Sequence, residues 1–195
     1  MKSTIGANKT FGMGYPIELL GKLLFDIDRL KQAKYTREAT YATFDCATGA
    51  WHLVDWCIAH ARDDQIKAWT GLDRDSKKSL TLGFVKTNAH HFPRLGYCQL
   101  IANSFKHLKI DFDDENLTSH NSVRFDPPFQ ADVIQNITTT PVGNIIHLKS
   151  GERFEAVALF TDLAHQWHLF LKREEMDLCP DEDLETIISE TLLRR

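Results

Sequence analysis

Apolar residues recur at spacings of three and four along the first third of the chain. From Pro16 to about Lys34 they form one stripe, and charged residues such as Lys22 and Arg29 fill the positions between them. This pattern predicts an amphipathic helix that begins at the proline. From about residue 36 to 61 a helical wheel is apolar or aromatic around most of its circumference, which favours a longer helix in the middle of a bundle.

Three further helical segments are expected before residue 110. Residues 62–79 indicate a short helix followed by a polar loop, and residues 79–89 indicate a bundle helix that contains Gly83. Pro93 should end the helix that precedes it, because proline disfavours helical geometry in the residue before it. Residues 94–110 then show helical spacing again and predict a fourth bundle helix.

The period of the pattern changes after an acidic loop at residues 111–122. Residues 129–135 and 144–157 are rich in β-branched residues in an alternating pattern, and a turn at residues 149–152 separates two of the runs. This arrangement predicts a hairpin with a third strand beside it. Helical spacing returns from about residue 158 to 175, and a short helix is expected at the end of the chain.

These elements predict an α+β fold that is mainly α. It consists of a bundle of about four helices, a small antiparallel hairpin or three-stranded sheet, and closing C-terminal helices. No internal repeat or low-complexity linker divides the chain. We therefore expect a single domain over residues 1–195, with the bundle at 16–110, the β insertion at 122–157 and the closing helices at 158–195.

Composition and charge narrow the classes of function. Of the 195 residues, 43% are hydrophobic and 26% are charged, and the formal net charge is -4. These values are typical of a globular domain and argue against a general affinity for nucleic acid. The four cysteines lack CxxC spacing, which favours free thiols in a reducing compartment. Because no signal peptide or membrane span is recognisable, we expect a cytoplasmic protein with no membrane contact. We expect no cofactor either.

The candidate site is a polar stripe on the predicted central helix. On a helical wheel, His52 and Asp55 share one side and Trp56 flanks them. In the last bundle helix, Asn103 and His107 lie one turn apart and can reach the same point. If the two helices are neighbours, we expect His52, Asp55, Asn103 and His107 to converge on one polar pocket between them, with Trp56 beside it.

Two other interpretations of this stripe stay open. The polar side chains could satisfy one another inside the bundle, because an unpaired buried polar group costs about 1 to 3 kcal/mol. Alternatively, His52, Asp55, His107 and Asp111 have plausible spacing for metal ligands. The Glu-x-x-His pairs of di-iron bundles and the HExxH motif are missing, however.

One glycine and four histidines carry smaller expectations. Gly49 lies in mid-helix, where glycine costs about 1 kcal/mol relative to alanine, so we expect another backbone or a ligand to approach it closely. His165 and His168 are expected to face solvent. His90 and His91 are expected to cap a helix end.

Three segments carry a resemblance to known proteins. The segments AWHLVDW (50–56), CQLIANSFKH (98–107) and FTDLAHQWHLFL (160–171) resemble, in order and spacing, a widespread family of uncharacterised prokaryotic proteins. Its members share an AWHL-x-DW helix, a C-x-x-I-A-N-x-x-KH helix and a W-x-x-FL helix. The resemblance covers roughly residues 46–172 and implies the helical architecture but no activity.

A more distant likeness is to the HEPN helical bundles, some of which are metal-independent ribonucleases of toxin and defence systems. This likeness implies that His107, with Lys106 or Asn103, would act on RNA, and it favours a homodimer. No arginine precedes His107 at the spacing of the HEPN signature, which departs from the pattern of the active enzymes.

The sequence as a whole favours a non-catalytic helical-bundle protein that binds a partner protein or a small ligand. The binding residues would be His52, Asp55, Trp56, Asn103 and His107. The HEPN-like ribonuclease is the alternative hypothesis, and a metal-dependent hydrolase is a further one.

Overall fold

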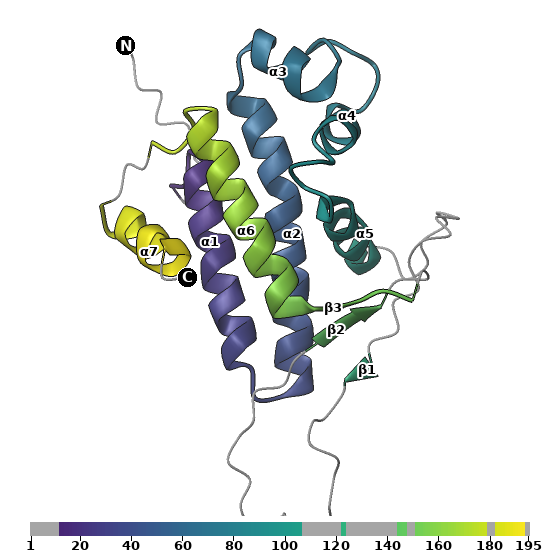
Figure 1. The fold of residues 1–195 in the computed structure, drawn as a ribbon, viewed down its shortest axis with the longest axis vertical. Helices are drawn as coiled ribbons and strands as arrows, with labels where there is room; N and C mark the ends of the chain where they lie inside the picture. Colours follow the sequence, from purple (N-terminus) through teal and green to yellow (C-terminus); the bar gives the residue numbers. More distant parts are fainter. Residues whose placement is uncertain (1–11, 107–121, 124–143, 148–150, 179–181, 194–195) are drawn as a thin grey trace, which may run out of the picture.

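The structure is a computed structural model of the whole chain, and it describes residues 12–106, 122–123, 144–147, 151–178 and 182–193. The elements, in chain order, are α1 (Pro16–Gln32), α2 (Thr36–His60), α3 (Asp63–Thr70), α4 (Leu80–Thr87), α5 (Leu95–Lys106), β1 (Ser122–Val123), β2 (Asn144–His147), β3 (Arg153–Glu155), α6 (Ala156–Arg173) and α7 (Glu182–Leu193). The predicted mainly-α fold with a small sheet is confirmed (Figure 1).

The helices α1 and α2 form a long hairpin that the rest of the fold surrounds (Figure 1). The first helix begins at Pro16, and the carboxylate of Glu18 accepts hydrogen bonds from the backbone N–H groups of Gly14 and Tyr15, at 2.7 and 2.8 Å. These bonds fix the chain at the start of the helix. The second helix packs against α1, α4, α5, α6 and β2, so its predicted central place is confirmed.

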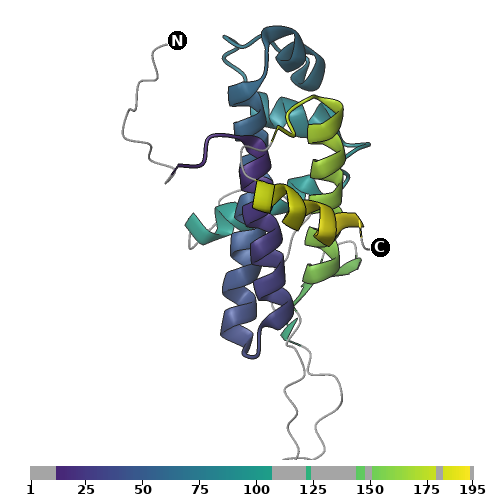
Figure 2. The same cartoon turned by 90° about the vertical axis from the view of Figure 1, so that its left-hand side faces the viewer.

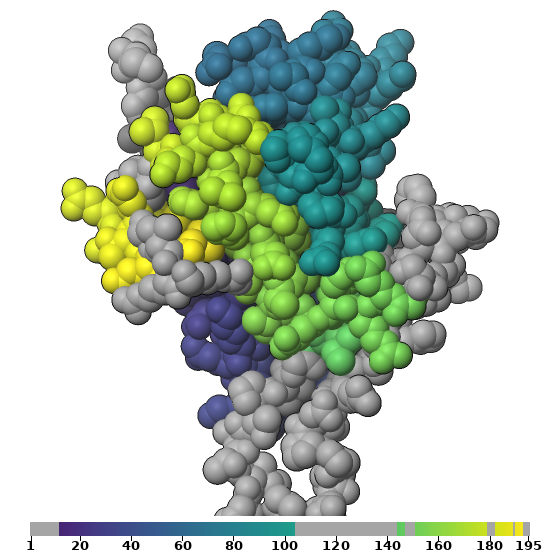
Figure 3. Space-filling view, in the orientation of Figure 1, coloured from purple at the N-terminus to yellow at the C-terminus, as the bar shows by residue number. Residues whose placement is uncertain are grey.

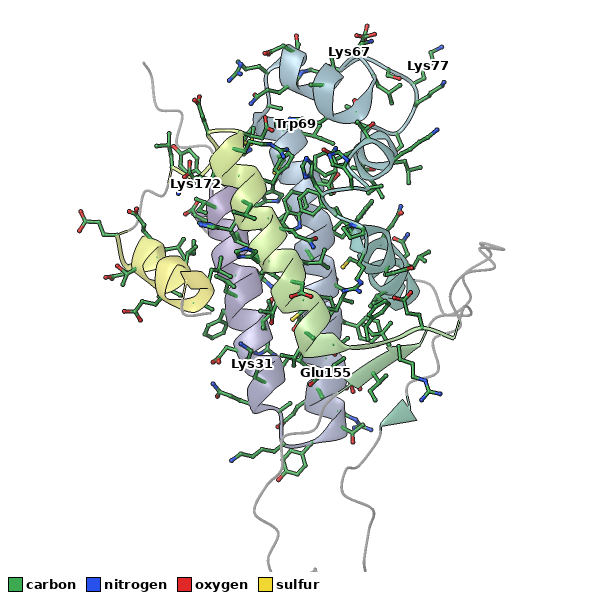
Figure 4. All side chains as sticks on the ribbon, viewed as in Figure 1. Lys31, Lys67, Trp69, Lys77, Glu155 and Lys172 are labelled. Carbon is green, nitrogen blue, oxygen red and sulfur yellow. The ribbon has the colours of Figure 1, made fainter. Side chains whose placement is uncertain are left out.

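The helix α6 closes the core against the α1–α2 hairpin (Figures 1 and 2). Its Trp167 is fully buried, and the indole Nε1–H donates a hydrogen bond to the carbonyl oxygen of Ala50, 3.1 Å away. Around Trp167 lies a cluster of aromatic rings that joins α6 to α3, α4 and the turn before α5, with Trp69 at the α3 end (Figure 4). The cluster consists of Trp69, Phe84, Phe92, Trp167 and Phe170. In the space-filling view the side chains of α6 meet those of α4 and α5 along a continuous seam (Figure 3).

A three-stranded antiparallel sheet in the order β1-β2-β3 lies at the start of α6. The predicted hairpin is confirmed, with Ile146 opposite Phe154, and Gly151 adopts the left-handed φ of 87° that its turn requires. Ser122, which falls in the predicted loop, begins β1 instead. The strand predicted at residues 129–135 lies outside the described residues.

The last helix, α7, crosses the bundle and rests on α1 (Figure 2). Ile188 and Leu192 are buried, and Leu184 packs against the edge of the core. Leu184 lies directly over Gly21 of α1, where the Cβ of any other residue would overlap with the leucine Cδ1 atom. Glycine at this position therefore allows the two helices to approach closely.

Within the described residues, no helix is both long and apolar enough to cross a membrane. Three of the four cysteines, Cys46, Cys57 and Cys98, are free and buried, as the sequence predicts. Burial raises the pKa of each of these thiols above its ordinary value, so they remain protonated. The fourth, Cys179, lies outside the described residues.

Candidate functional site

The candidate residues of α2 lie on the outer side of the helix. His52 and Trp56 are half-buried, and Asp55 is exposed. The buried side of α2 is instead formed by small and apolar residues such as Cys46 and Ala50. The expectation that this polar stripe is buried is therefore wrong for Asp55, whose carboxylate reaches the surface. For His52, which is half-buried, it is correct only in part.

The helix α5 does pack against α2, as the proposed pocket requires. Asn103 is half-buried near the end of α5. His107 lies outside the described residues, and the structure describes the backbone of Lys106 but not the surroundings of its side chain. The convergence of His52, Asp55, Asn103 and His107 on one pocket thus stays a prediction, as does the ribonuclease role of His107.

A ladder of rings continues from the predicted residues toward the end of α2. The ring of Trp56 stacks on that of His60, with centroids 6.5 Å apart and planes inclined by 21°. The ring of Tyr15, which is 48% exposed, also lies near His60, with centroids 6.2 Å apart. We refer to Trp56, His60 and Tyr15 as the ring ladder, and His52 precedes Trp56 by one helical turn.

His60 ties this ladder to the chain before α1. Its Nδ1 lies 2.8 Å from the carbonyl oxygen of Trp56, and its Nε2 lies 2.7 Å from the carbonyl oxygen of Gly14. Since a carbonyl oxygen only accepts, each contact is a hydrogen bond when that ring nitrogen carries the proton. His60 and Tyr15 were missed by the sequence analysis, although the i, i+4 spacing of Trp56 and His60 was a usable signal.

A charged cluster of Lys22, Asp26, Arg29 and Asp45 connects α1 with α2. The carboxylate of Asp26 is buried and accepts from Lys22 Nζ at 2.5 Å and from Arg29 Nη1 at 3.1 Å. The same Arg29 nitrogen reaches Asp45 of α2 at 3.1 Å, and the hydrogen bond to Asp45 raises the pKa of Arg29. The two positive and two negative charges of this cluster balance, so it serves to join α1 to α2 rather than to attract a charged ligand.

The histidines outside α2 differ from the expectations. His91 does not cap a helix; its Nε2 accepts a hydrogen bond from Arg173 Nη1 at 2.8 Å. Desolvation by burial lowers the pKa of His91, and the positive charge of Arg173 lowers it further. His165 and His168 are half-buried rather than solvent-facing, and their Nδ1 atoms are buried with no hydrogen-bond partner among the described residues.

The expectation that another backbone comes close to Gly49 is wrong, and the alternative of a ligand there stays a prediction. A Cβ at this position would lie 3.8 Å from Leu23, which is an ordinary contact, so no backbone comes unusually close to it. Within the part of the chain that the structure describes, no three histidine, cysteine or acidic side chains lie where they could hold a metal ion together. Two members of the suggested metal set, His107 and Asp111, lie outside that part.

The ring ladder and the charged cluster provide aromatic and polar groups that can contact another molecule. An aromatic face supplies large, rigid contact area, and the neighbouring polar atoms supply specificity. Comparisons of the chain with family models, with curated proteins and with solved structures return no match.

Proposed function

We propose that this chain is a non-catalytic helical-bundle protein that binds a partner protein through the outer face of α2. The proposal rests on the half-buried ring of Trp56, which lies one helical turn after His52. This ring stacks on that of His60. Tryptophan is enriched among the residues that dominate binding energy, and a ring held by its neighbours loses little conformational entropy on binding.

The extent of this outer face of α2 favours a protein as the binding partner rather than a small molecule. Asp55 and Tyr41 are exposed along the same helix, so the contact surface extends over several turns of α2. Asn103 at the end of α5 would add a polar contact at the edge, in keeping with a polar rim around an aromatic centre.

Affinity capture of partners from the source cells tests the proposal. The wild-type chain is compared with His52→Ala, Trp56→Ala and Asn103→Ala variants whose circular dichroism is unchanged. Leu82→Ala provides the control, because Leu82 is 53% exposed and belongs to a different helix, α4. We expect the Trp56→Ala variant to lose the partner and the Leu82→Ala variant to keep it. Equal capture by all of these variants would show that the face does not bind.

A further inference from the structure

A second surface of the molecule is already occupied by a helix of the chain itself. Gly21 lies beneath Leu184 of α7, and Ile17 and Leu24 flank Gly21 on the same side of α1 by helical spacing. Both flanking residues are buried, at 2% and 4% exposure. We refer to Ile17, Gly21 and Leu24 as the α7-docking surface.

The helix α7 contacts the bundle through a single stripe. Leu184, Ile188 and Leu192 follow one another at intervals of four residues, and the last two are 3% and 4% exposed. The acidic residues of the helix lie at its other positions and no lysine or arginine occurs within it; they are Glu182, Asp183, Glu185 and Glu190. This is the pattern of an amphipathic peptide that lays its apolar side on a complementary surface.

The apolar surface around α7 extends beyond what the helix covers. Phe25 lies one turn after Gly21 on α1 and is 68% exposed, and Ile187 on α7 is 52% exposed. The chain leaves α6 through Glu175, whose φ of 58° is unfavourable for a residue with a side chain, and then passes Leu178, which is 77% exposed. A helix that covered Phe25 as well as Gly21 would bury more apolar area than α7 does.

We propose that the α7-docking surface is a binding site for an acidic amphipathic helix of a partner protein, and that α7 occupies it as a tethered competitor. The partner helix carries leucine or isoleucine at positions i, i+4 and i+8 and an acidic opposite side, as α7 does. Lys172 projects from α6 on the side of the molecule where α7 lies (Figure 4). Its positive charge would attract the acidic side chains of the partner helix. Binding of the partner then requires that α7 detach.

The first test uses a labelled synthetic peptide with the sequence of residues 181–195 and measures its binding by fluorescence anisotropy. In the full chain, the paired substitutions Ile188→Glu and Leu192→Glu release α7 without altering α1. We expect saturable binding of the peptide to this released variant. Wild type should bind the peptide about a hundredfold more weakly, because a short tether gives α7 an effective concentration on the order of millimolar.

A matched pair of glycine substitutions shows whether the peptide uses the same surface. Adding Gly21→Val to the released variant should abolish binding, because the new side chain takes the place of Leu184. Adding Gly49→Ala should leave binding unchanged, since a Cβ there makes an ordinary contact. Failure of the peptide to bind the folded released variant, or equal binding after Gly21→Val, overturns the proposal.

Hydrogen exchange on the unmodified protein provides a second test that needs no variant. If α7 detaches, its amides exchange much faster than those of α2 and at a rate independent of protein concentration. Exchange of α7 as slow as that of α2 contradicts the proposal. Dimers of the wild type that the Gly21→Val variant cannot form would identify α7 of a second copy as the occupant, which overturns the assignment to a partner protein.

Discussion

Nη1 of Arg29 lies 3.1 Å from a carboxylate oxygen of Asp45, and this ion pair links α1 to α2 at the surface. The same nitrogen also reaches the buried carboxylate of Asp26, which Lys22 approaches from the other side. The side chain of Asp26 is 4% exposed and that of Asp45 is 48% exposed. The two carboxylates therefore share a cation but differ in how much water competes for them.

Neutralising Asp26 should cost more stability than neutralising Asp45. Asp26→Asn weakens two charge-assisted hydrogen bonds at a buried site, and we expect a loss of about 1 to 3 kcal/mol in the free energy of unfolding. Asp45→Asn removes a half-exposed pair, and we expect at most about 1 kcal/mol. Urea unfolding followed by circular dichroism measures both. A larger loss for Asp45→Asn would contradict this account of the cluster.

Truncation of Trp167 should be among the most destabilising changes in α6. Trp167→Ala removes a fully buried indole, and we expect a loss of about 3 to 5 kcal/mol. Trp167→Phe keeps a ring but loses the donor to Ala50, so its cost should be smaller, about 1 to 3 kcal/mol. Leu169→Ala, at a residue 54% exposed on the same helix, is the control and should change stability by less than about 0.5 kcal/mol.

Two helical glycines should respond in opposite directions to replacement by alanine. At Gly49 the new Cβ makes ordinary contacts with Leu23, so Gly49→Ala should stabilise the fold by about 0.5 to 1 kcal/mol through helix propensity. At Gly83 the Cβ would lie 2.8 Å from the backbone oxygen of Thr70, which cannot move freely. We expect Gly83→Ala to destabilise by about 1 to 3 kcal/mol. Thermal unfolding of both variants decides the comparison, and stabilisation by Gly83→Ala would refute the steric argument.

Acid should destabilise the protein through His168. Burial lowers the pKa of His168 from its ordinary value of 6.5, and Lys172 and His165 lower it further, while Asp177 raises it. The folded state then holds fewer protons than the unfolded state, so stability is full above pH 6.5 and falls as the pH drops toward the folded pKa. His168→Gln should flatten this dependence. NMR titration of the His168 ring checks it, and a midpoint above 6.5 would show the opposite shift.

The buried thiols should resist alkylation while the protein is folded. Burial raises the pKa of Cys46, Cys57 and Cys98, so little reactive thiolate forms at neutral pH. Iodoacetamide treatment followed by peptide mass spectrometry should find these three unmodified in the native protein and modified in guanidinium. Rapid native labelling of Cys98 would show that α5 opens readily.

Helical spacing predicted the long elements well, because burial of one stripe decides where a helix lies in a bundle. The starts of α1 and α2, the hairpin turn at Gly151 and the burial of Trp167 all follow from local pattern. The short strand at Ser122 was missed because two residues show no period, and its pairing with β2 depends on distant parts of the chain.

The candidate site was harder to predict, because a wheel shows which residues share a side but not which side is covered. His52 and Asp55 share a side, yet that side is the outer one. Gly21 and Gly49 look alike in the sequence, but only Gly21 receives a neighbouring helix closely. Asp26 is buried where α2 approaches α1, and the spacing within α1 does not reveal this burial.

The bond between Trp167 and Ala50 spans 117 positions of the chain, and the one between Asn144 and Thr43 spans 101. During synthesis the α1–α2 hairpin can therefore form early, but its apolar side stays open until α6 leaves the ribosome. Closing such long loops is slow compared with forming local contacts. A nascent chain that pauses between α5 and α6 would expose Ala50 and its neighbours, and it would then be a natural client for chaperones.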